Sequence, residues 1–340
     1  MKARPSNCPG TDVAGRPAFP ETAVEIGLAA AVVTVERSNP QILVARTGET
    51  GAVEVPSGRF DPLAHRTLEI GLRAFVSEQT GLSLGYVEQL YTFGDRGRAA
   101  GEAGMPHVVS IGYLALTRVD GQAKALPPGA RFRPWYGYFP WEDWRGGRPA
   151  ILGTILPLLR EWSEDTEAEK ADVARRALPR AARFRLSFGI DGAPWDEEKV
   201  LERYELLYEA GLIAEALHDG RPAALARERL PALGEAMAFD HRRILATAMG
   251  RLRAKLKYRP VVFELLPATF TLTALQSTVE AISGRHVHKQ NFRRLVENAA
   301  LVEPTGEQTT TRGRPAALFR FRRDVVQERP APGLRLGTRG

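Results

Sequence analysis

Short apolar runs bounded by turn residues predict that residues 22–120 contain a sheet. The runs 27–36 and 41–48 flank the sequence RSNP, which favours a tight turn, so together they predict a β-hairpin. Further strands are expected at 52–60, 86–95 and 107–119, with a polar loop at 96–106 between the last two.

A different spacing follows the third of these runs. Leu68, Leu72, Phe75 and Val76 recur at the intervals of a helix face, and Gly81 is a typical helix C-cap. A mixed sheet carrying one helix is the simplest arrangement, which places this part of the chain in the α+β class.

The centre of the chain consists of an aromatic segment followed by a helical one. Residues 121–150 are rich in Pro, Gly and Trp, and the segment RFRPWYGYFPWEDW is aromatic enough to predict packing over the first domain. Residues 151–258 read as mostly helical, with residues 197–217 the best amphipathic segment. A long helix beginning near residue 240 is expected to lead into the last module.

The last module has the pattern helix, turn, helix, hairpin. Residues 271–282 predict an amphipathic helix capped by Thr271 or Thr273, and a second helix follows the short turn SGRHV. Residues 301–321 predict two strands around a Gly- and Arg-rich loop. This order is that of a winged helix-turn-helix.

The whole chain is therefore predicted to be α+β, with an N-terminal mixed sheet, a helical middle segment and a C-terminal winged helix-turn-helix. Its 340 residues suggest about two domains with connecting segments. The expected divisions are a disordered arm at 1–21, a sheet domain at 22–150, a helical segment at 151–239, a DNA-binding domain at 240–325 and a flexible tail at 326–340.

Charge separates the two ends of the chain. Residues 241–340 hold 19 Lys and Arg and 7 Asp and Glu, a balance of +12, whereas the formal charge of the whole chain is only +7. A basic module joined to a mildly acidic one predicts a polyanionic partner for the basic end. A solvated basic surface without a partner is the alternative.

Hydropathy and cysteine content argue against a membrane-spanning, secreted or disulfide-rich protein. The longest apolar run, Ile26 to Val35, is about half the length that a membrane-spanning helix needs, and the first twenty residues lack the apolar core of a signal peptide. Cys8 is the only cysteine, which excludes a disulfide framework. We expect a cytoplasmic protein without a membrane partner.

The second helix of the last module carries the candidate DNA contacts. Phe292, Leu295, Val296 and Ala299 form its inner face, which leaves polar side chains facing outward near its start. Side chains at the start of such a helix reach base edges in the major groove. The candidates are His288, Lys289, Gln290, Asn291, Arg293 and Arg294 on the helix, with Arg312 and Arg314 at the tip of the wing. A homodimer is expected, because paired modules read palindromic operators.

Gly58 and Gly81 bracket a strand, a turn and a helix that together resemble the Nudix box, G-x5-E-x7-R-E-U-x-E-E-x-G-U, where U is apolar. In that family, glutamates on the helix hold divalent metal beside a pyrophosphate. Aligned on Gly81, the helical half keeps only Glu78 of its three glutamates; Phe75 and Gln79 replace the others, and Ala74 replaces the arginine. The spacing between the two glycines is two residues longer than in the family. One carboxylate is a poor Mg²⁺ site, so no catalytic residue and no metal ligand is predicted.

The wider sequence is similar to the Nudix-related, NrtR-type transcriptional regulators of NAD metabolism. The blocks HRTLEIGLRAFVSEQTGL and EQLYTFGDRGR carry this resemblance in the first domain, and FTLTALQSTVEAISGRHVHKQNFRR and GRPAALFRF carry it in the last. The resemblance implies a repressor of NAD biosynthesis or salvage genes. It also implies a degenerate Nudix domain that senses ADP-ribose or a related nucleotide without a required cofactor.

A nucleotide sensor needs phosphate and base contacts more than carboxylates. Guanidinium groups bind phosphate bidentately, and aromatic rings stack on bases. The candidates are Arg59, Phe60, Arg73, Phe93, Arg96 and Arg98. Arg73 has the alternative of an i,i+4 pair with Glu69, and Phe93 that of a core residue.

Two other functions remain open on the sequence alone. One is an active, Mg²⁺-dependent pyrophosphohydrolase of ADP-ribose or a similar nucleotide. The other is a nucleic-acid-binding protein with no small ligand.

Overall fold

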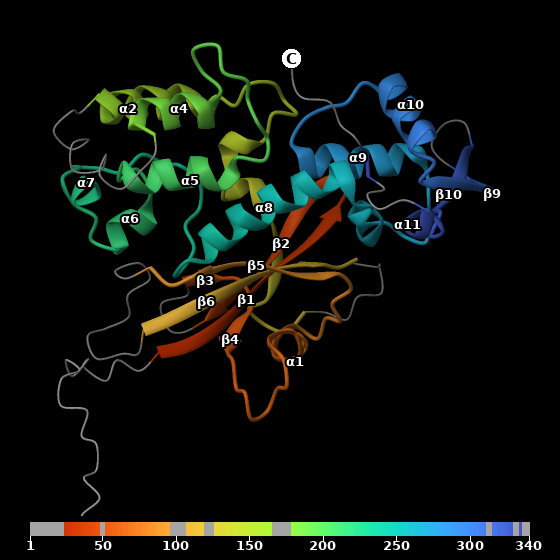
Figure 1. Ribbon diagram of the computed structural model, residues 1–340, viewed down its shortest axis with the longest axis horizontal. Coiled ribbons are helices and arrows are strands. Elements are labelled where there is room, and N and C mark those ends of the chain that lie inside the picture. Colours follow the sequence, from red (N-terminus) through yellow and green to blue (C-terminus); the bar gives the residue numbers. More distant parts are fainter. Residues whose placement is uncertain are drawn as a thin grey trace, which may run out of the picture.

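The computed structural model describes residues 24–47, 52–95, 107–118, 126–164, 178–310, 315–328 and 333–334. An N-terminal sheet, a group of helices and a smaller C-terminal module follow one another along the chain (Figure 1). The α+β prediction is confirmed. The expected disordered arm at 1–21 lies outside the described residues, as does most of the expected tail at 326–340.

The sheet is mixed. Its order is β3-β2-β1-β6-β5, with β4 paired to β1 and β7 to β2, and only the central pair β1–β6 is parallel. The expected strand at 52–60 is divided into two short strands. The bounds are β1 Val24–Glu36, β2 Asn39–Thr47, β3 Ala52–Glu54, β4 Ser57–Arg59, β5 Val87–Phe93, β6 His107–Leu116 and β7 Arg131–Pro134.

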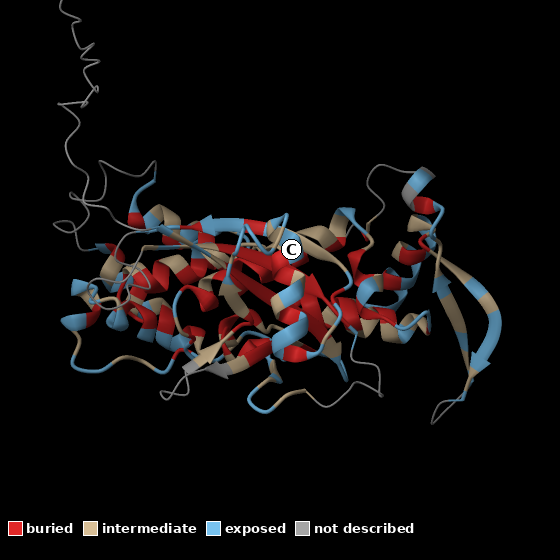
Figure 2. Ribbon diagram, turned by 90° about the horizontal axis from the view of Figure 1, so that it is seen from below, coloured by how far each residue is buried: buried red, intermediate tan, exposed pale blue. Residues whose placement is uncertain are grey.

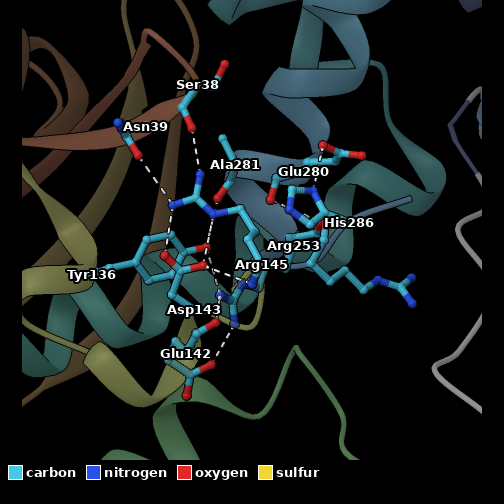
Figure 3. A network of polar contacts seen from close by, with 12 residues as sticks. Ser38, Asn39, Tyr136, Glu142, Asp143, Arg145, Arg253, Glu280, Ala281 and His286 are labelled. Carbon is cyan, nitrogen blue, oxygen red and sulfur yellow. Dashed lines mark hydrogen bonds and ion pairs between the residues drawn. The ribbon is translucent and has the colours of Figure 1, made fainter. Parts of the chain in front are cut away.

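The predicted hairpin is the β1–β2 pair. Its turn places Arg37 at φ 48° and Ser38 at φ 64°, and two successive positive φ angles are what a tight primed turn requires. The guanidinium of Arg145 binds the Ser38 carbonyl at 2.6 Å and the carboxylate of Asp143, which fixes the turn to a segment far along the chain (Figure 3).

One face of the sheet is covered by α1, Leu68–Thr80. Gly81 ends the helix at φ 68°, as the sequence predicts, and the Thr67 hydroxyl caps its start by accepting a hydrogen bond from the Ile70 amide. Leu72 and Val76 pack with residues of β1 that point to this face.

The opposite face is covered by the aromatic segment and by α8, His241–Tyr258. Trp135, Tyr138, Phe139 and Trp141 are fully buried, in the two short 3₁₀ helices that follow β7 (η1 Trp135–Gly137, η2 Pro140–Glu142) and beside them. The prediction that the aromatic stretch packs over the first domain is therefore confirmed. Figure 2 shows buried residues along the middle of the molecule and exposed ones along its rim.

The middle of the chain is helical, as predicted. The amphipathic segment 197–217 is divided near Gly211, where φ is 64° and an added Cβ would lie 2.3 Å from the Ala224 nitrogen. The helices are α2 Leu152–Glu164, α4 Arg180–Phe188, α5 Val200–Glu209, α6 Ala214–His218, α7 Pro222–Leu225 and α8. No helix within the described ranges is both long and apolar enough to cross a membrane.

A buried ionic cluster joins the aromatic segment to the helices. The carboxylate of Glu142 accepts hydrogen bonds from Arg203 of α5 at 2.6 and 3.0 Å and from Arg253 of α8 at 2.6 Å. All three side chains are buried. Burial alone would raise the pKa of the Glu142 carboxyl, but the two guanidinium groups lower it overall, so the group is ionised.

The C-terminal module is a winged helix, which confirms that prediction. A three-stranded sheet in the order β8-β10-β9 packs beside two helices joined by a short turn. The bounds are η3 Val261–Leu265, β8 Thr269–Phe270, α9 Leu272–Ser283, α10 Lys289–Ala299, β9 Val302–Thr309, β10 Ala316–Phe321 and α11 Val325–Glu328.

Candidate functional site

The turn between α9 and α10 determines where the second helix begins. The Thr271 hydroxyl caps α9 by accepting from the Ala274 amide at 3.1 Å, and Gly284 ends it at φ 70°. The carboxylate of Glu280 then accepts hydrogen bonds from the Val287 amide at 2.9 Å and lies 3.1 Å from the His286 ring. Burial would raise the pKa of Glu280, but these hydrogen bonds and one from Gln276 lower it overall.

Helix α10 has one buried face and one solvated face. Phe292 and Val296 are buried against the module, which fixes the rotation of the helix about its axis. None of the outward-facing side chains makes an ion pair with another residue of the described chain. His288, Lys289, Gln290, Asn291, Arg293 and Arg294, the six predicted DNA contacts on this helix, are all exposed.

The wing is the hairpin β9–β10. Arg320 of β10 donates to Glu303 of β9 at 2.6 Å across the strands, which leaves this arginine less available to a partner. Arg312 and Arg314, the predicted contacts at the tip, lie outside the described residues.

Part of the positive charge of residues 241–340 is structural. Arg242 is 1% exposed and bonds Glu215 and the carbonyls of Tyr138 and Leu233, and Arg253 is also 1% exposed. The surface excess is therefore smaller than the sequence count, although the exposed start of α10 keeps its cations.

A cavity of about 270 Å³ lies between the sheet and the start of α8. Residues of β1, β4 and β6 line one side, and the segment entering α8 lines the other. The polar side chains that line it are Glu25, Ser57, Arg59, Asp95, Ser110, Asp240 and His241. A guanidinium, several carboxylates and hydroxyls in one hollow can recognise phosphate and sugar hydroxyl groups together.

His241 is the most enclosed polar group in this cavity. Its side chain is 5% exposed, and its Nδ1 has no hydrogen-bond partner among the described residues. Burial lowers the pKa of the imidazole to about 4, so the ring is neutral at neutral pH. A neutral ring can accept or donate one hydrogen bond per nitrogen, which suits an uncharged polar ligand group.

The predicted nucleotide contacts are only partly brought together. Arg59 lines the cavity, 3.8 Å from Glu25. Phe60 instead packs against Gly71 of α1, where a Cβ would lie 3.2 Å from its ring. Arg96 and Arg98 lie outside the described residues.

Two of these candidates have structural roles instead. Arg73 donates to Glu69 at 2.9 Å and to the carbonyls of Leu84 and Gly85, so it ties α1 to the loop that follows. Phe93 is 4% exposed in the core, with the Arg243 guanidinium 4.8 Å from its ring centre. Neither lines the cavity. Arg73 is held by Glu69 and by the loop after α1, and Phe93 is enclosed in the core.

Six polar cavity residues were missed from the sequence: Glu25, Ser57, Asp95, Ser110, Asp240 and His241. Apart from the adjacent pair Asp240 and His241, they come from distant segments, and no local motif relates them. Only the fold, which places the start of α8 over the sheet, brings them together.

The degenerate Nudix helix does not fit a metal site. Phe75 stands at a glutamate position and packs against Gly58, where a Cβ would lie 3.3 Å from its ring, and Gln79 donates to the Ser57 carbonyl at 2.8 Å. Glu78 is exposed. The described ranges contain no cluster of three or more His, Cys, Asp or Glu side chains arranged to hold a metal ion. We derive no metal-dependent step from these residues.

Comparison with known proteins agrees with this geometry. Residues 262–321 match the family model described as the NrtR DNA-binding winged helix domain. The chain shares the fold of a solved NrtR structure over most of its length. In this fold a Nudix-like mixed sheet comes first, a helical segment follows, and the winged helix that matches the family model comes last.

Two solved structures share the fold over most of this chain. Shewanella oneidensis NrtR in complex with a 27mer DNA matches with a TM-score of 0.52 and 21% identity, over 89% of this chain and 95% of that one. A second crystal structure of Shewanella oneidensis NrtR matches with a TM-score of 0.51 and 20% identity, over 88% of this chain and 95% of that one.

A sequence relative is the ADPR responsive transcriptional repressor NtrR of Acinetobacter baylyi. It is 40% identical over 85 residues, which are 25% of this chain and 34% of that repressor. The match therefore spans about a third of the relative's length.

Proposed function

We propose that this protein is a transcriptional repressor that binds operator DNA through α10 and responds to ADP-ribose or a related NAD-derived nucleotide. The observation that carries the proposal is the exposed, polar start of α10 within an NrtR-type winged helix. The regulated genes are those of NAD biosynthesis or salvage, and the operator is bound by a homodimer.

The residues of α10 divide by chemistry. Gln290 and Asn291 can form bidentate hydrogen bonds with adenine in the major groove. Arg293 and Arg294 can read guanine or bind phosphate, and Lys289 suits phosphate. In this proposal Arg312 and Arg314 of the wing contact the backbone or the minor groove.

The cavity between the sheet and α8 is the proposed effector site. Arg59 suits the pyrophosphate, and the carboxylates and His241 suit ribose hydroxyl groups. The A. baylyi relative is an ADPR responsive repressor, which supports ADP-ribose as the first effector to test. The absence of a fitting set of metal ligands around Glu78 supports sensing rather than hydrolysis.

Fluorescence anisotropy with a labelled duplex from the gene's own upstream region tests the proposal. The expected result is tight binding at physiological salt, weaker binding to random duplex, and a change in affinity on adding ADP-ribose but not AMP. Equal affinity for both duplexes would refute the DNA-binding function. Mg²⁺-dependent release of AMP from ADP-ribose that is lost in Glu78→Gln would instead support the hydrolase.

A further inference from the structure

Helix α8 contacts both proposed sites. Asp240, at its N-cap, and His241, in its first turn, line the sheet cavity. Arg253, about 18 Å further along the helix axis at about 1.5 Å per residue, lies against α9 of the winged helix. Figure 1 shows α8 crossing from the sheet to the end of α9.

Every nitrogen of the Arg253 guanidinium is hydrogen-bonded, and Nε makes the contact with the winged helix. Nε donates to the Ile282 carbonyl near the end of α9 at 2.9 Å. The two terminal nitrogens bind the Glu142 carboxylate at 2.6 Å, the Glu197 carbonyl at 2.9 Å and the Glu142 carbonyl at 3.2 Å (Figure 3). The side chain is thus held between the aromatic segment and α9.

Tyr136 makes a second contact beside it. Its hydroxyl donates to the Ala281 carbonyl at 2.7 Å and lies 3.4 Å from the Arg253 guanidinium. The end of α9 is closely seated here, because a Cβ added at Gly284 would lie 2.5 Å from the Glu142 carbonyl oxygen and 2.9 Å from Arg253. Closely packed contacts transmit a displacement rather than absorb it.

The same end of α9 determines where α10, the proposed DNA-recognition helix, begins. Glu280, one turn before Gly284, holds the Val287 amide and the His286 ring at the entrance to α10. A shift of the last turn of α9 therefore changes the angle at which α10 leaves the turn.

The cavity end of α8 is also tied to the ligand-lining residues. Arg243 donates to the Asp95 carboxylate, which lines the cavity, and to Glu205 of α5 at 2.8 Å. A ligand that changes the position of Asp95, Asp240 or His241 acts directly on the first turns of α8.

We propose that α8 transmits occupancy of the sheet cavity to the recognition helix, with Arg253 as the positioning residue at the α9 contact. This inference rests on the proposed function. Effector binding shifts α8, the contacts of Arg253 and Tyr136 shift the end of α9, and the Glu280 turn reorients α10. Differential contacts of the ligand with the two positions of α8 supply the coupling free energy.

The test measures coupling separately from either binding event. For each variant, ADP-ribose affinity is measured by calorimetry and operator affinity by anisotropy, the latter with and without saturating ADP-ribose. The variants are Arg253→Lys, which keeps the charge but not the five donors, and Tyr136→Phe, which removes one hydroxyl. Arg251→Lys is the matched control, because Arg251 lies on the same helix and makes none of these contacts.

We expect ADP-ribose to change the operator affinity of the wild type and of Arg251→Lys about 5- to 150-fold, the usual range for coupled sites. In Arg253→Lys and Tyr136→Phe the change falls to about twofold or less, while ADP-ribose affinity stays within about threefold. Wild-type coupling in both variants would overturn the relay. If Arg253→Lys fails to fold, Tyr136→Phe alone decides. If ADP-ribose neither binds the wild type nor changes its operator affinity, the proposed function is refuted instead.

Discussion

The Glu142→Gln substitution is the sharpest test of what holds the sheet, the helices and the winged helix together. Glutamine keeps the shape of the side chain but removes the charge that two buried guanidinium groups share. The wild-type carboxylate accepts three charge-assisted hydrogen bonds, from Arg203 at 2.6 and 3.0 Å and from Arg253 at 2.6 Å. In the variant, two buried cations face each other without a counter-charge.

The expected loss in the free energy of unfolding is about 3–5 kcal/mol, the cost of breaking a buried ion pair by removing one partner. Urea is the denaturant of choice, because it does not screen charge. With an m value of about 3 kcal/mol/M, the midpoint falls by about 1–1.7 M. Tryptophan fluorescence and circular dichroism are recorded together, since coincident curves establish a single transition.

Glu303→Gln is the matched control. It removes the carboxylate that pairs with Arg320, but both side chains are substantially exposed, 39% and 62%. An exposed pair contributes about 0–1 kcal/mol, so the midpoint changes little. A loss below about 1 kcal/mol in Glu142→Gln, at unchanged m, would refute the argument that the buried cluster needs its charge.

Three further predictions concern other parts of the molecule. Arg294→Ala weakens operator binding by about 1–3 kcal/mol if the side chain reads a base bidentately, and unchanged affinity and specificity in anisotropy would remove it from the interface. The folded pKa of His241, about 4, lies below its ordinary 6.5, so the unfolded chain binds more protons between these values. The free energy of unfolding therefore decreases by up to about 3 kcal/mol as the pH is lowered from 6.5 to 4, and His241→Gln lacks that slope in pH-dependent unfolding. Gly211→Ala destabilises by more than about 1 kcal/mol, because strain at positive φ adds to a clash with the Ala224 backbone. Gly220→Ala is its control, because Gly220 also has a positive φ, 66°, but has open space around it, so this variant loses less stability. Equal losses of stability in thermal unfolding would mean that backbone strain alone matters and the clash does not.

Local signals account for the parts of the fold that the sequence predicts well. The β1–β2 turn, the Gly81 cap of α1 and the Thr271 cap of α9 depend on neighbouring residues. Their propensities act over a few positions, so they can be read without the tertiary structure. The exposed start of α10 follows for the same reason, from the spacing of Phe292 and its apolar neighbours.

The remaining features depend on contacts between distant segments. Arg253 and Glu142 are 111 positions apart, and no pattern in either segment indicates that they meet in the core. His241 belongs to a helix that sequence reasoning assigned to the DNA-binding domain, yet its side chain lines a cavity of the sheet. Phe93 fitted a stacking role as well as a core role, and only burial decides between them.

The burial of Arg242 and Arg253 has a consequence for how ionic strength acts on this protein. Protein–DNA affinity falls with added salt in proportion to the number of phosphates that surface cations neutralise, because each contact releases condensed counterions. Guanidinium groups enclosed by Glu215 and Glu142 release none. The slope of log affinity against log salt will therefore report a smaller cationic footprint than the composition of the last hundred residues suggests.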